Sequence, residues 1–310
     1  MRVPYFPGCT LNTKAAGYDR SGRAVAAALG LPMDELDGWQ CCGATFPLSI
    51  DNSMALVAPT RILAQAEQAG DTVATLCALC YNVLKRTQAA LKRDPDMLDR
   101  INWFTDMPYH GGVRVVHLLE LLRDTLTWEG LRGAVRRPLT GLKVAPYYGC
   151  LLLRPAQEMQ LDDPERPTIL GDCMAALGAE VIDFPYAVEC CGSYLAVGRA
   201  EVPDRLAAAI LNSARRSGAD AIVTACPLCQ FNLDYPQRGP PGPESVGARR
   251  AVPQQTGEAS RERGLPVLYF TQLMAIALDL AREDWGLEGL YVDPTPLLER
   301  IPAREEEAAT

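Results

Sequence analysis

Ten of the eleven cysteines in this 310-residue chain fall into two matched sets of five. Each set contains one cysteine, then a Cys-Cys-Gly tripeptide more than 30 residues later, then a Cys-x-x-Cys pair after a further gap of more than 30 residues. Grouped thiolates hold metals or carry out redox chemistry, so the duplication predicts two such sites. The first set is Cys9, Cys41, Cys42, Cys77 and Cys80, and the second is Cys150, Cys190, Cys191, Cys226 and Cys229.

The surroundings of these cysteines argue against a disulfide framework. The opening MRVPYFPGCT has no basic segment followed by an apolar run, so nothing marks the chain for secretion, and no apolar stretch approaches a membrane span in length. We therefore expect a cytoplasmic protein in a reducing compartment, where grouped cysteines bind metals or act catalytically. A thioredoxin-like dithiol would need only the Cys-x-x-Cys pair and would leave three cysteines of each set unexplained.

Two metal-binding interpretations remain. Structural zinc takes four ligands, commonly two Cys-x-x-Cys pairs separated by about 15–20 residues. Here the gaps are longer and each set offers five thiols, so zinc in one lobe is kept only as the alternative. Iron–sulfur clusters, whose usual ligands are thiolates, agree better with the surplus thiol.

The residues next to the cysteines support the cluster interpretation. Adjacent cysteines of a regular strand point to opposite faces, so both can face one cluster only in a turn. Gly43 and Gly192, which follow the two Cys-Cys pairs, are expected to make that turn and to let the backbone approach the cofactor. Each Cys-x-x-Cys pair also precedes a helical pattern, so the amides of a helix N-terminus would face anionic sulfur.

Short strand-like runs alternate with helix-like runs along the chain, which predicts an α/β fold with a mainly parallel sheet flanked by helices in each of two pseudo-symmetric lobes. Every cysteine motif follows a predicted strand, so the motifs can converge at the C-terminal strand edges, where cofactors bind in such folds. The predicted strands are Arg2–Phe6, Leu36–Trp39, Thr72–Leu76, Val113–Val116, Lys143–Tyr148, Glu180–Phe184, Ala221–Ala225 and Pro266–Tyr269, and the clearest helices are Lys14–Leu29, Ser53–Ala69, Leu118–Leu126, Thr168–Leu177, Val202–Ser217 and Thr271–Ala281.

The internal repeat sets the predicted domain boundaries. VATLCALCYNVL aligns with IVTACPLCQFNL, and WQCCGAT with VECCGSY, both at an offset of 149 residues. We predict an N-terminal lobe over residues 1–138 and a C-terminal lobe over residues 139–302, each of ordinary domain size. Residues 236–266 are dense in proline, glycine and charge and are predicted to form a disordered insertion, and residues 303–310 a disordered tail.

Charge and motif content exclude several classes of function. The formal net charge is −8 and there is no extended basic block, so nucleic-acid binding has no support. The sequence also lacks a glycine-rich phosphate loop and a dinucleotide fingerprint. A flavin or nicotinamide, if the reaction needs one, would therefore be bound by another chain.

Two further residues are candidates for chemistry. Cys173 lies in an apolar helical run and is expected to be a buried free thiol. His117 follows the fourth predicted strand, at the same sheet edge as the cysteines, so it could supply a proton to a leaving thiolate or hydrogen-bond a cluster sulfur. The alternative, which the pattern favours, is a histidine at a helix start with no catalytic role.

These motifs resemble those of the cysteine-rich CCG-domain family, and most closely the B subunit of heterodisulfide reductase. The resemblance spans both lobes and rests on YFPGC, the two CCG tripeptides, the two Cys-x-x-Cys pairs, VHLLELL and YFTQLMAIAL. It implies two non-cubane 4Fe–4S clusters, one on each five-cysteine set. It also implies a small-molecule disulfide bound between the clusters, a ferredoxin-like C subunit that delivers electrons, and a flavin-containing A subunit that supplies them.

The leading functional hypothesis is therefore the catalytic subunit of a heterodisulfide reductase-like complex, without nucleic-acid partners or direct membrane insertion. Reduction of a disulfide takes two electrons, and two facing one-electron centres would supply them without a flavin in this chain. Three alternatives stay open. They are an iron–sulfur electron-transfer subunit of a related oxidoreductase of the lactate, glycolate or fumarate type, a subunit of a sulfur-oxidising complex of the same family, and a non-catalytic relay or zinc-stabilised scaffold.

Overall fold

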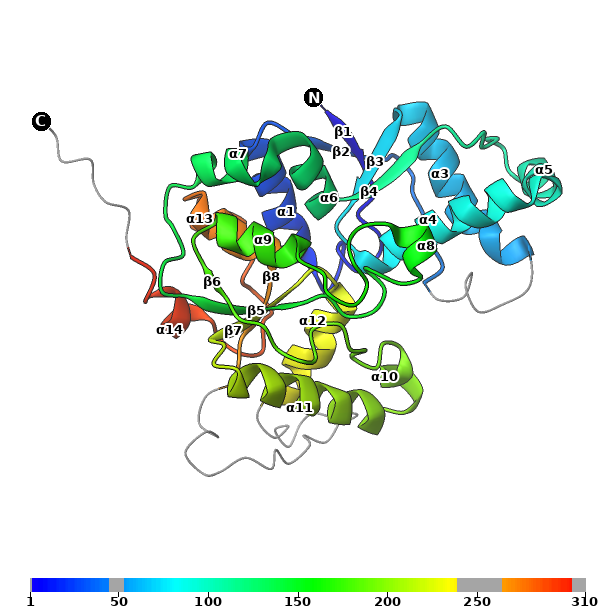
Figure 1. The fold of residues 1–310 in the computed structure, drawn as a ribbon. Helices are drawn as coiled ribbons and strands as arrows, with labels where there is room; N and C mark the ends of the chain where they lie inside the picture. Colours follow the sequence, from blue (N-terminus) through cyan, green and yellow to red (C-terminus); the bar gives the residue numbers. More distant parts are fainter. Residues whose placement is uncertain (1, 45–52, 239–263, 303–310) are drawn as a thin grey trace, which may run out of the picture.

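Two four-stranded parallel sheets form the framework, one in each lobe (Figure 1). The computed structural model describes residues 2–44, 53–238 and 264–302. The strand order is β2-β1-β3-β4 in the first sheet and β6-β5-β7-β8 in the second, and all neighbouring strands are parallel. The predicted two-lobed α/β fold is thus confirmed. The strands are β1 Val3–Tyr5, β2 Met33–Glu35, β3 Thr72–Thr75, β4 Arg114–His117, β5 Lys143–Tyr147, β6 Glu180–Val181, β7 Ala221–Thr224 and β8 Val267–Tyr269.

One predicted strand is misplaced in the sequence analysis. The second strand, β2, occupies Met33–Glu35 and ends before the predicted Leu36–Trp39. The Leu36 N–H still donates to the Tyr5 carbonyl at 2.9 Å, but the following residues turn at Gly38, whose φ of 62° lies in the left-handed region. The chain therefore leaves the sheet earlier than the apolar pattern indicates and reaches Cys41 through a turn.

Helices cover both sheets, and the number of buried residues in a helix depends on whether it lies at the surface or between the lobes. α11 is amphipathic, with Ala207, Ile210, Leu211 and Ala214 buried at helical spacing, whereas all eight residues of α13 are buried between the lobes. The α-helices are α1 Ala16–Ala28, α3 Val57–Ala69, α4 Ala78–Arg93, α5 Pro95–Phe104, α6 Leu118–Leu121, α7 Thr127–Ala134, α8 Ala156–Met159, α9 Ile169–Ala176, α10 Leu195–Gly198, α11 Glu201–Arg216, α12 Pro227–Asp234, α13 Phe270–Ala277 and α14 Thr295–Leu298, and the short 3-10 or π segments are η1 Ser53–Leu56, η2 Leu122–Leu126, η3 Tyr235–Gln237 and η5 Arg282–Trp285.

The lobes pack through two pairs of helices related by the internal repeat. α1 of the first lobe packs against α13 of the second, and α6 of the first lobe packs against α9 of the second (Figure 1). At the first contact the hydroxyl oxygens of Ser21 and Thr271 lie 2.7 Å apart, and both residues are buried. The lobes are therefore held by a continuous apolar interface with polar contacts inside it, rather than by a flexible linker.

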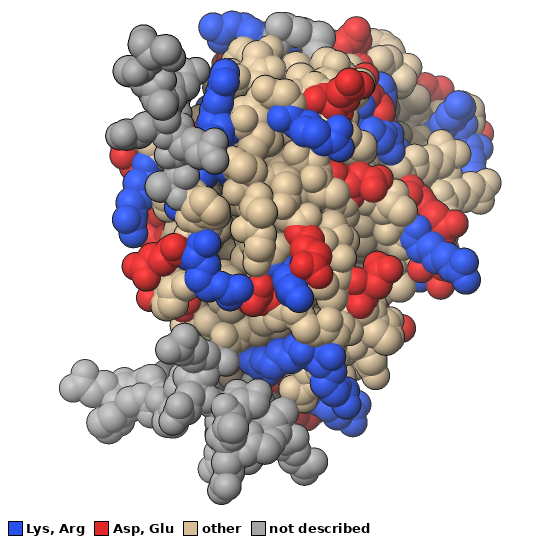
Figure 2. Space-filling model, turned by 60° about the vertical axis from the view of Figure 1, so that its left-hand side comes forward, with Lys and Arg blue, Asp and Glu red and all other residues tan. Residues whose placement is uncertain are grey.

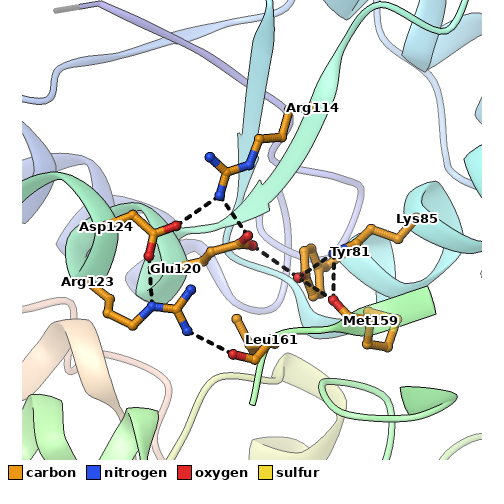
Figure 3. A network of polar contacts seen from close by, with 8 residues as sticks. All are labelled: Tyr81, Lys85, Arg114, Glu120, Arg123, Asp124, Met159 and Leu161. Atoms are coloured by element: carbon orange, nitrogen blue, oxygen red, sulfur yellow. Dashed lines mark hydrogen bonds and ion pairs between the residues drawn. The ribbon is translucent and has the colours of Figure 1, made fainter. Parts of the chain in front are cut away.

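A network of polar side chains lies at this interface (Figure 3). The buried carboxylate of Glu120 accepts a hydrogen bond from the Tyr81 hydroxyl at 3.0 Å and pairs with the Arg114 guanidinium at 2.9 Å. Arg114 also pairs with Asp124 at 2.9 Å. Because Tyr81 follows Cys80 directly, the network fixes the helix that carries this cysteine.

The same network reaches into the second lobe (Figure 3). The Lys85 ammonium donates to the carbonyl of Met159 at 2.5 Å, and the Arg123 guanidinium donates to the carbonyl of Leu161 at 2.8 Å. Both carbonyls belong to the segment that follows Cys150 in the second lobe. The two buried members, Tyr81 and Glu120, would each cost about 1–3 kcal/mol if left unpaired. Because the Tyr81 hydroxyl also lies 3.3 Å from the Met159 carbonyl, the network favours one relative placement of the two lobes.

The surface carries charges of both signs. On the face shown in Figure 2, acidic and basic side chains are interspersed among uncharged ones. Some of the charges are paired, as for Arg2 and Asp34 at 2.7 Å. That face therefore presents no field of a single sign that would steer a polyanion. Among the described helices, none has both the length and the apolar character that a membrane span requires.

The predicted insertion is described only at its two ends. Of residues 236–266, the structure describes 236–238 and 264–266, and residues 239–263 lie outside the described part, as does the predicted tail 303–310. At the described ends the Leu265 N–H donates to the side-chain oxygen of Gln237 at 2.8 Å, and Leu265 is buried. These two ends therefore belong to the packed part of the second lobe.

Candidate metal centre

The strand order brings the cysteine motifs of each lobe to one sheet edge. β1 and β3 are neighbours in the middle of the sheet. β2 is added on the outer side of β1 and β4 on the outer side of β3, so the strand order reverses between β1 and β3. Ligands of parallel sheets bind at such a switch point, outside the carboxyl ends of the strands. Cys9 follows β1 and Cys77 follows β3, and in the second lobe Cys150 follows β5 and Cys226 follows β7. Both lobes therefore place the first cysteine and the Cys-x-x-Cys pair at this point.

The first set brings its thiols together in pairs. The sulfur of Cys9 lies 3.8 Å from that of Cys41, and the sulfur of Cys42 lies 3.6 Å from that of Cys80. Gly43 has a φ of 86°, and its N–H donates to the Cys41 sulfur at 3.4 Å. Cys42, Cys77 and Cys80 are buried, whereas Cys9 and Cys41 are exposed, so this set has a protected side and an open side.

The second set repeats this arrangement. The sulfurs of Cys150 and Cys190 are 3.8 Å apart, and Gly192, with a φ of 90°, donates its N–H to the Cys190 sulfur at 3.3 Å. The side-chain amide of Asn232 donates to the Cys191 sulfur at 3.4 Å. A small cavity opens among four of the five cysteines of this set, namely Cys150, Cys191, Cys226 and Cys229.

Two of the cysteines cap helices. Cys77 is the N-cap residue of α4, and Cys226 is the N-cap residue of α12. The unpaired amides and the positive end of a helix favour negative charge at this position. The sequence pattern predicts a helix after each Cys-x-x-Cys pair, whereas the observed helices begin inside the pairs, at Ala78 and Pro227.

Hydrogen bonding between the thiols lowers the pKa of one member of a pair and raises that of the other. Contacts with Cys41 and Cys80 lower the pKa of Cys42 to about 4, and the contact with Cys150 lowers that of Cys190 to about 6. The same contact with Cys42, together with burial, raises the pKa of Cys80. In each hydrogen-bonded pair, one thiol is therefore the more acidic. The other thiol becomes a thiolate only when a positive charge lies nearby to offset the negative charge of the first.

This donor set fits an iron–sulfur cluster in each lobe. Five thiolates at one site require several positive charges, and thiolates are the ligands that iron–sulfur clusters use. Within the described residues, no group of three or more Cys, His, Asp or Glu side chains has an arrangement that could hold a single metal ion. The residues that would hold the cofactor are the five cysteines of each set, with Gly43 and Gly192 shaping the turns.

The two sets face each other across the lobe interface. The Tyr18 hydroxyl lies 2.8 Å from the carbonyl oxygen of Leu76 and 3.3 Å from that of Ala225, and these residues directly precede Cys77 and Cys226. One hydroxyl therefore touches both cysteine turns. The Tyr18 ring also stacks on that of Tyr269, with centroids 4.0 Å apart.

A second contact, from α4, also joins the two sets. The side-chain amide of Asn82 donates to the carbonyls of Leu151 and Arg154, at 2.7 Å each. Asn82 lies two residues after Cys80, and the carbonyls belong to the loop that follows Cys150. The helix carrying one set therefore holds the loop carrying the other.

Two glycines beside the cysteines were missed by the sequence analysis. Gly8 and Gly149 directly precede Cys9 and Cys150 and have φ values of 74° and 63°. A Cβ atom on Gly8 would lie 2.7 Å from the Cys80 sulfur, and one on Gly149 would lie 2.9 Å from the Cys229 sulfur. Only glycine allows this approach. The signal was present, because both sets begin with the dipeptide Gly-Cys.

The structure places His117 and Cys173 outside the two thiol sets. His117 is fully buried, which lowers its pKa to about 4, and its Nδ1 accepts the Leu119 N–H at 3.2 Å while Nε2 donates to the Leu76 carbonyl at 2.9 Å. It therefore caps α6 and supports the turn before Cys77, with both ring nitrogens occupied. The buried Cys173 sulfur lies 3.9 Å from the sulfur of Met274, within the second lobe.

Duplicated parallel sheets with facing thiol-rich edges define a two-lobed cysteine-rich protein. The profile of the cysteine-rich domain family (CCG) matches residues 3–85 in the first lobe and 144–234 in the second. The chain belongs to this family, and the resemblance noted from its motifs is confirmed.

Relatives of similar length come from different reductase complexes. The chain is 36% identical to the 8-methylmenaquinol:fumarate reductase membrane anchor subunit of Wolinella succinogenes, over 94% of this chain and 98% of that protein. It is 29% identical to the B subunit of the ferredoxin/F420H2-dependent CoB–CoM heterodisulfide reductase of Methanosarcina acetivorans, over 97% of both chains.

A solved structure shares the fold. It is the crystal structure of a hypothetical protein from Helicobacter pylori, with a TM-score of 0.70 at 14% sequence identity. The match covers 94% of this chain and 52% of that one, so this chain spans about half the length of the solved protein.

Proposed function

We propose that this chain is the iron–sulfur subunit of a multi-subunit reductase, and that its two facing sites together cleave a small-molecule disulfide. The observation that carries the proposal is the contact of one hydroxyl, that of Tyr18, with the residues preceding both Cys77 and Cys226. Two redox sites held this close can act on one substrate. The similarity to B subunits of heterodisulfide reductases supports the same reaction class.

The chemistry of the reaction agrees with a pair of sites. A disulfide takes up two electrons and two protons, the S–S bond breaks, and two thiols are released. When bound, a 4Fe–4S cluster of the non-cubane type in each lobe would supply one electron. Cleavage by a single one-electron site would leave a sulfur radical, so the duplication meets a requirement of the reaction.

The chain's own residues would position the substrate rather than transfer its protons. Cys9 and Cys41 are exposed, whereas the cysteines of both Cys-x-x-Cys pairs are buried, so a substrate would enter from the side of the first two. His117 is neutral and both of its nitrogens are occupied, so we assign it to the support of the Leu76 turn. Protons would then come from solvent at the open side.

Electrons would come from partner proteins. This chain shows no dinucleotide fingerprint in its sequence. We propose that a ferredoxin-like C subunit is the direct donor and that a flavin-containing A subunit supplies it in turn.

The test uses the full chain, reconstituted anaerobically. It should carry about eight irons, as two four-iron clusters require. With a reduced viologen as electron donor, it should convert the coenzyme M–coenzyme B heterodisulfide into two thiols. The Cys173→Ala variant, which removes a cysteine outside both sets, should keep iron and turnover. Full iron loading and reduction without any thiol release would refute disulfide cleavage, and about four irons with one zinc would refute the paired sites.

A second candidate function has a specific observation in its favour. The relative at 36% identity is a subunit of an 8-methylmenaquinol:fumarate reductase, so this chain would relay electrons from a menaquinol toward the reduction of fumarate. In that case the clusters should be reduced by a menaquinol in the presence of the partner subunits and reoxidised on addition of fumarate. The same preparation should release no thiol from a disulfide.

A further inference from the structure

A buried hydroxyl between the two thiol sets has no partner in the part of the chain that the structure describes. Tyr194 stands three residues after Cys191, and the oxygen of its hydroxyl is shielded from solvent without a hydrogen bond. A buried hydroxyl left unpaired costs about 1–3 kcal/mol, so such a group calls for an explanation. A ligand that accepts a hydrogen bond from the Tyr194 hydroxyl would supply that explanation.

Tyr194 belongs to the second lobe, and its hydroxyl is close enough to the cysteines of both sets to feel their charge. Its pKa is raised by burial and by the negative charges of Cys77, Cys42, Cys226 and Cys80, in that order, and three of these four belong to the first set. The neighbouring Ser193 lines a cavity together with Ala78, the first residue of α4. The loop after the second Cys-Cys-Gly therefore reaches across the interface to the first set.

The loop that carries Tyr194 is held in place from behind. Ser193 has a φ of 45°, a conformation uncommon for a residue with a side chain. Its carbonyl accepts a hydrogen bond from the side-chain amide of Asn232 at 3.1 Å. The Leu195 N–H donates to the Gly192 carbonyl at 3.1 Å. The direction of the phenol is therefore set by α12 and by the turn itself.

We infer that the Tyr194 hydroxyl donates a hydrogen bond to a sulfur of the cluster held by the first set, so that the second lobe tunes the redox centre of the first. This inference rests on the proposed function, because it requires a cluster on the first set. The phenol is not repeated in the first lobe, since the position aligned with Tyr194 there is Thr45.

The direction of the effect follows from charge. A donor directed at a cluster sulfur stabilises the reduced, more negative state more than the oxidised state, and hydrogen bonds to sulfur are among the factors that set cluster potentials. Removing the hydroxyl should therefore lower the midpoint potential of the first-set cluster. The cluster on the second set, whose Cys191 sulfur receives the Asn232 amide instead, should keep its potential.

The experiment is an anaerobic redox titration of the full chain, followed by electron paramagnetic resonance. Signals of the first-set cluster are those that the Cys41→Ala variant loses. In Tyr194→Phe these signals should titrate at lower potential, with an equilibrium constant for one-electron reduction that falls by about three- to tenfold, where tenfold corresponds to about 59 mV. Incorporation of 3-fluorotyrosine at position 194, a stronger donor, should shift the same signals in the opposite direction.

Matched controls separate this effect from a general disturbance. Tyr186→Phe removes the same atom from an exposed tyrosine of the same lobe and should leave both potentials unchanged. Iron content measured for each variant reports whether the clusters assemble. If the first set holds no cluster in the unmodified chain, the proposed function fails and this inference fails with it. If both clusters assemble and Tyr194→Phe shifts neither potential, or shifts both equally, this inference alone is refuted.

Discussion

The two lobes share a backbone plan but differ in the polar side chains that support it. Five residues after the last cysteine of each set stand Lys85 in the first lobe and Asp234 in the second. Lys85 donates to the Met159 carbonyl across the interface, whereas Asp234 accepts the N–H groups of Tyr291 and Val292 within its own lobe. In the first lobe the residue at this position therefore contacts the second lobe, whereas in the second lobe it contacts the C-terminal segment of the same lobe.

The lobes also differ in how far their sites are open. The outer cysteines of the first set, Cys9 and Cys41, are exposed, whereas Cys150 and Cys190 are half-buried. The other three cysteines are buried in both sets, namely Cys42, Cys77 and Cys80 in the first and Cys191, Cys226 and Cys229 in the second. The difference teaches that duplication has produced two sites with the same cysteine pattern but unequal exposure to solvent.

The largest expected effect tests whether each lobe builds its own site. In Gly8→Ala the new Cβ would lie 2.7 Å from the Cys80 sulfur, and in Gly149→Ala it would lie 2.9 Å from the Cys229 sulfur. Because the sulfur must move away, each variant should lose the cluster of its own lobe, which is about half of the iron. Iron analysis with electron paramagnetic resonance would measure this loss.

Two other glycines serve as controls for these substitutions. Gly30 and Gly218 have φ values of 77° and 88°, and a Cβ atom at either position would meet nothing within 4 Å. Their alanine variants carry the same backbone strain, about 1–2 kcal/mol, but should retain all the iron. Equal iron loss in all four variants would mean that backbone strain, and not contact with sulfur, is responsible.

A smaller effect is expected where one lobe supports the other. The Asn82→Ala variant leaves the carbonyls of Leu151 and Arg154 without their donor, which should lower the free energy of unfolding by about 2–3 kcal/mol. The second-lobe cluster should become easier to remove with a chelator, although the substitution is in the first lobe. Asn12→Ala, at an exposed position, is the control. Destabilisation of the first cluster alone would contradict the cross-lobe role.

The smallest effect concerns pH and belongs to the second lobe. Burial raises the pKa of Asp234 to about 6, above its value of about 4 in an unfolded chain. A raised pKa stabilises the fold at low pH, and this contribution is lost as the pH rises through 6. Between pH 5 and 7.5 the free energy of unfolding should fall by about 1–2 kcal/mol more in the unmodified chain than in Asp234→Asn. Parallel pH profiles would show that Asp234 does not titrate in this range.

The sequence alone was sufficient for the parts of the structure that repeat. The alternation of apolar runs predicts both parallel sheets, and the positions of Cys9, Cys77, Cys150 and Cys226 after strands predict the sheet edge where these cysteines lie. The boundary of β2 could not be predicted, because Gly38 ends the strand through a turn that an apolar pattern does not reveal. The contacts of Tyr18, Asn82 and Tyr194 were also out of reach, since they depend on how the lobes pack.

The central claim is that the two sites act as a unit, and single-site loss tests it most directly. Cys41→Ala removes a ligand of the first cluster and Cys190→Ala a ligand of the second. Each variant should keep about half of the iron yet lose nearly all disulfide cleavage, and the double variant should be no worse, because groups that act together are not additive. Substantial thiol release by either single variant would contradict the account, because one site would then be sufficient.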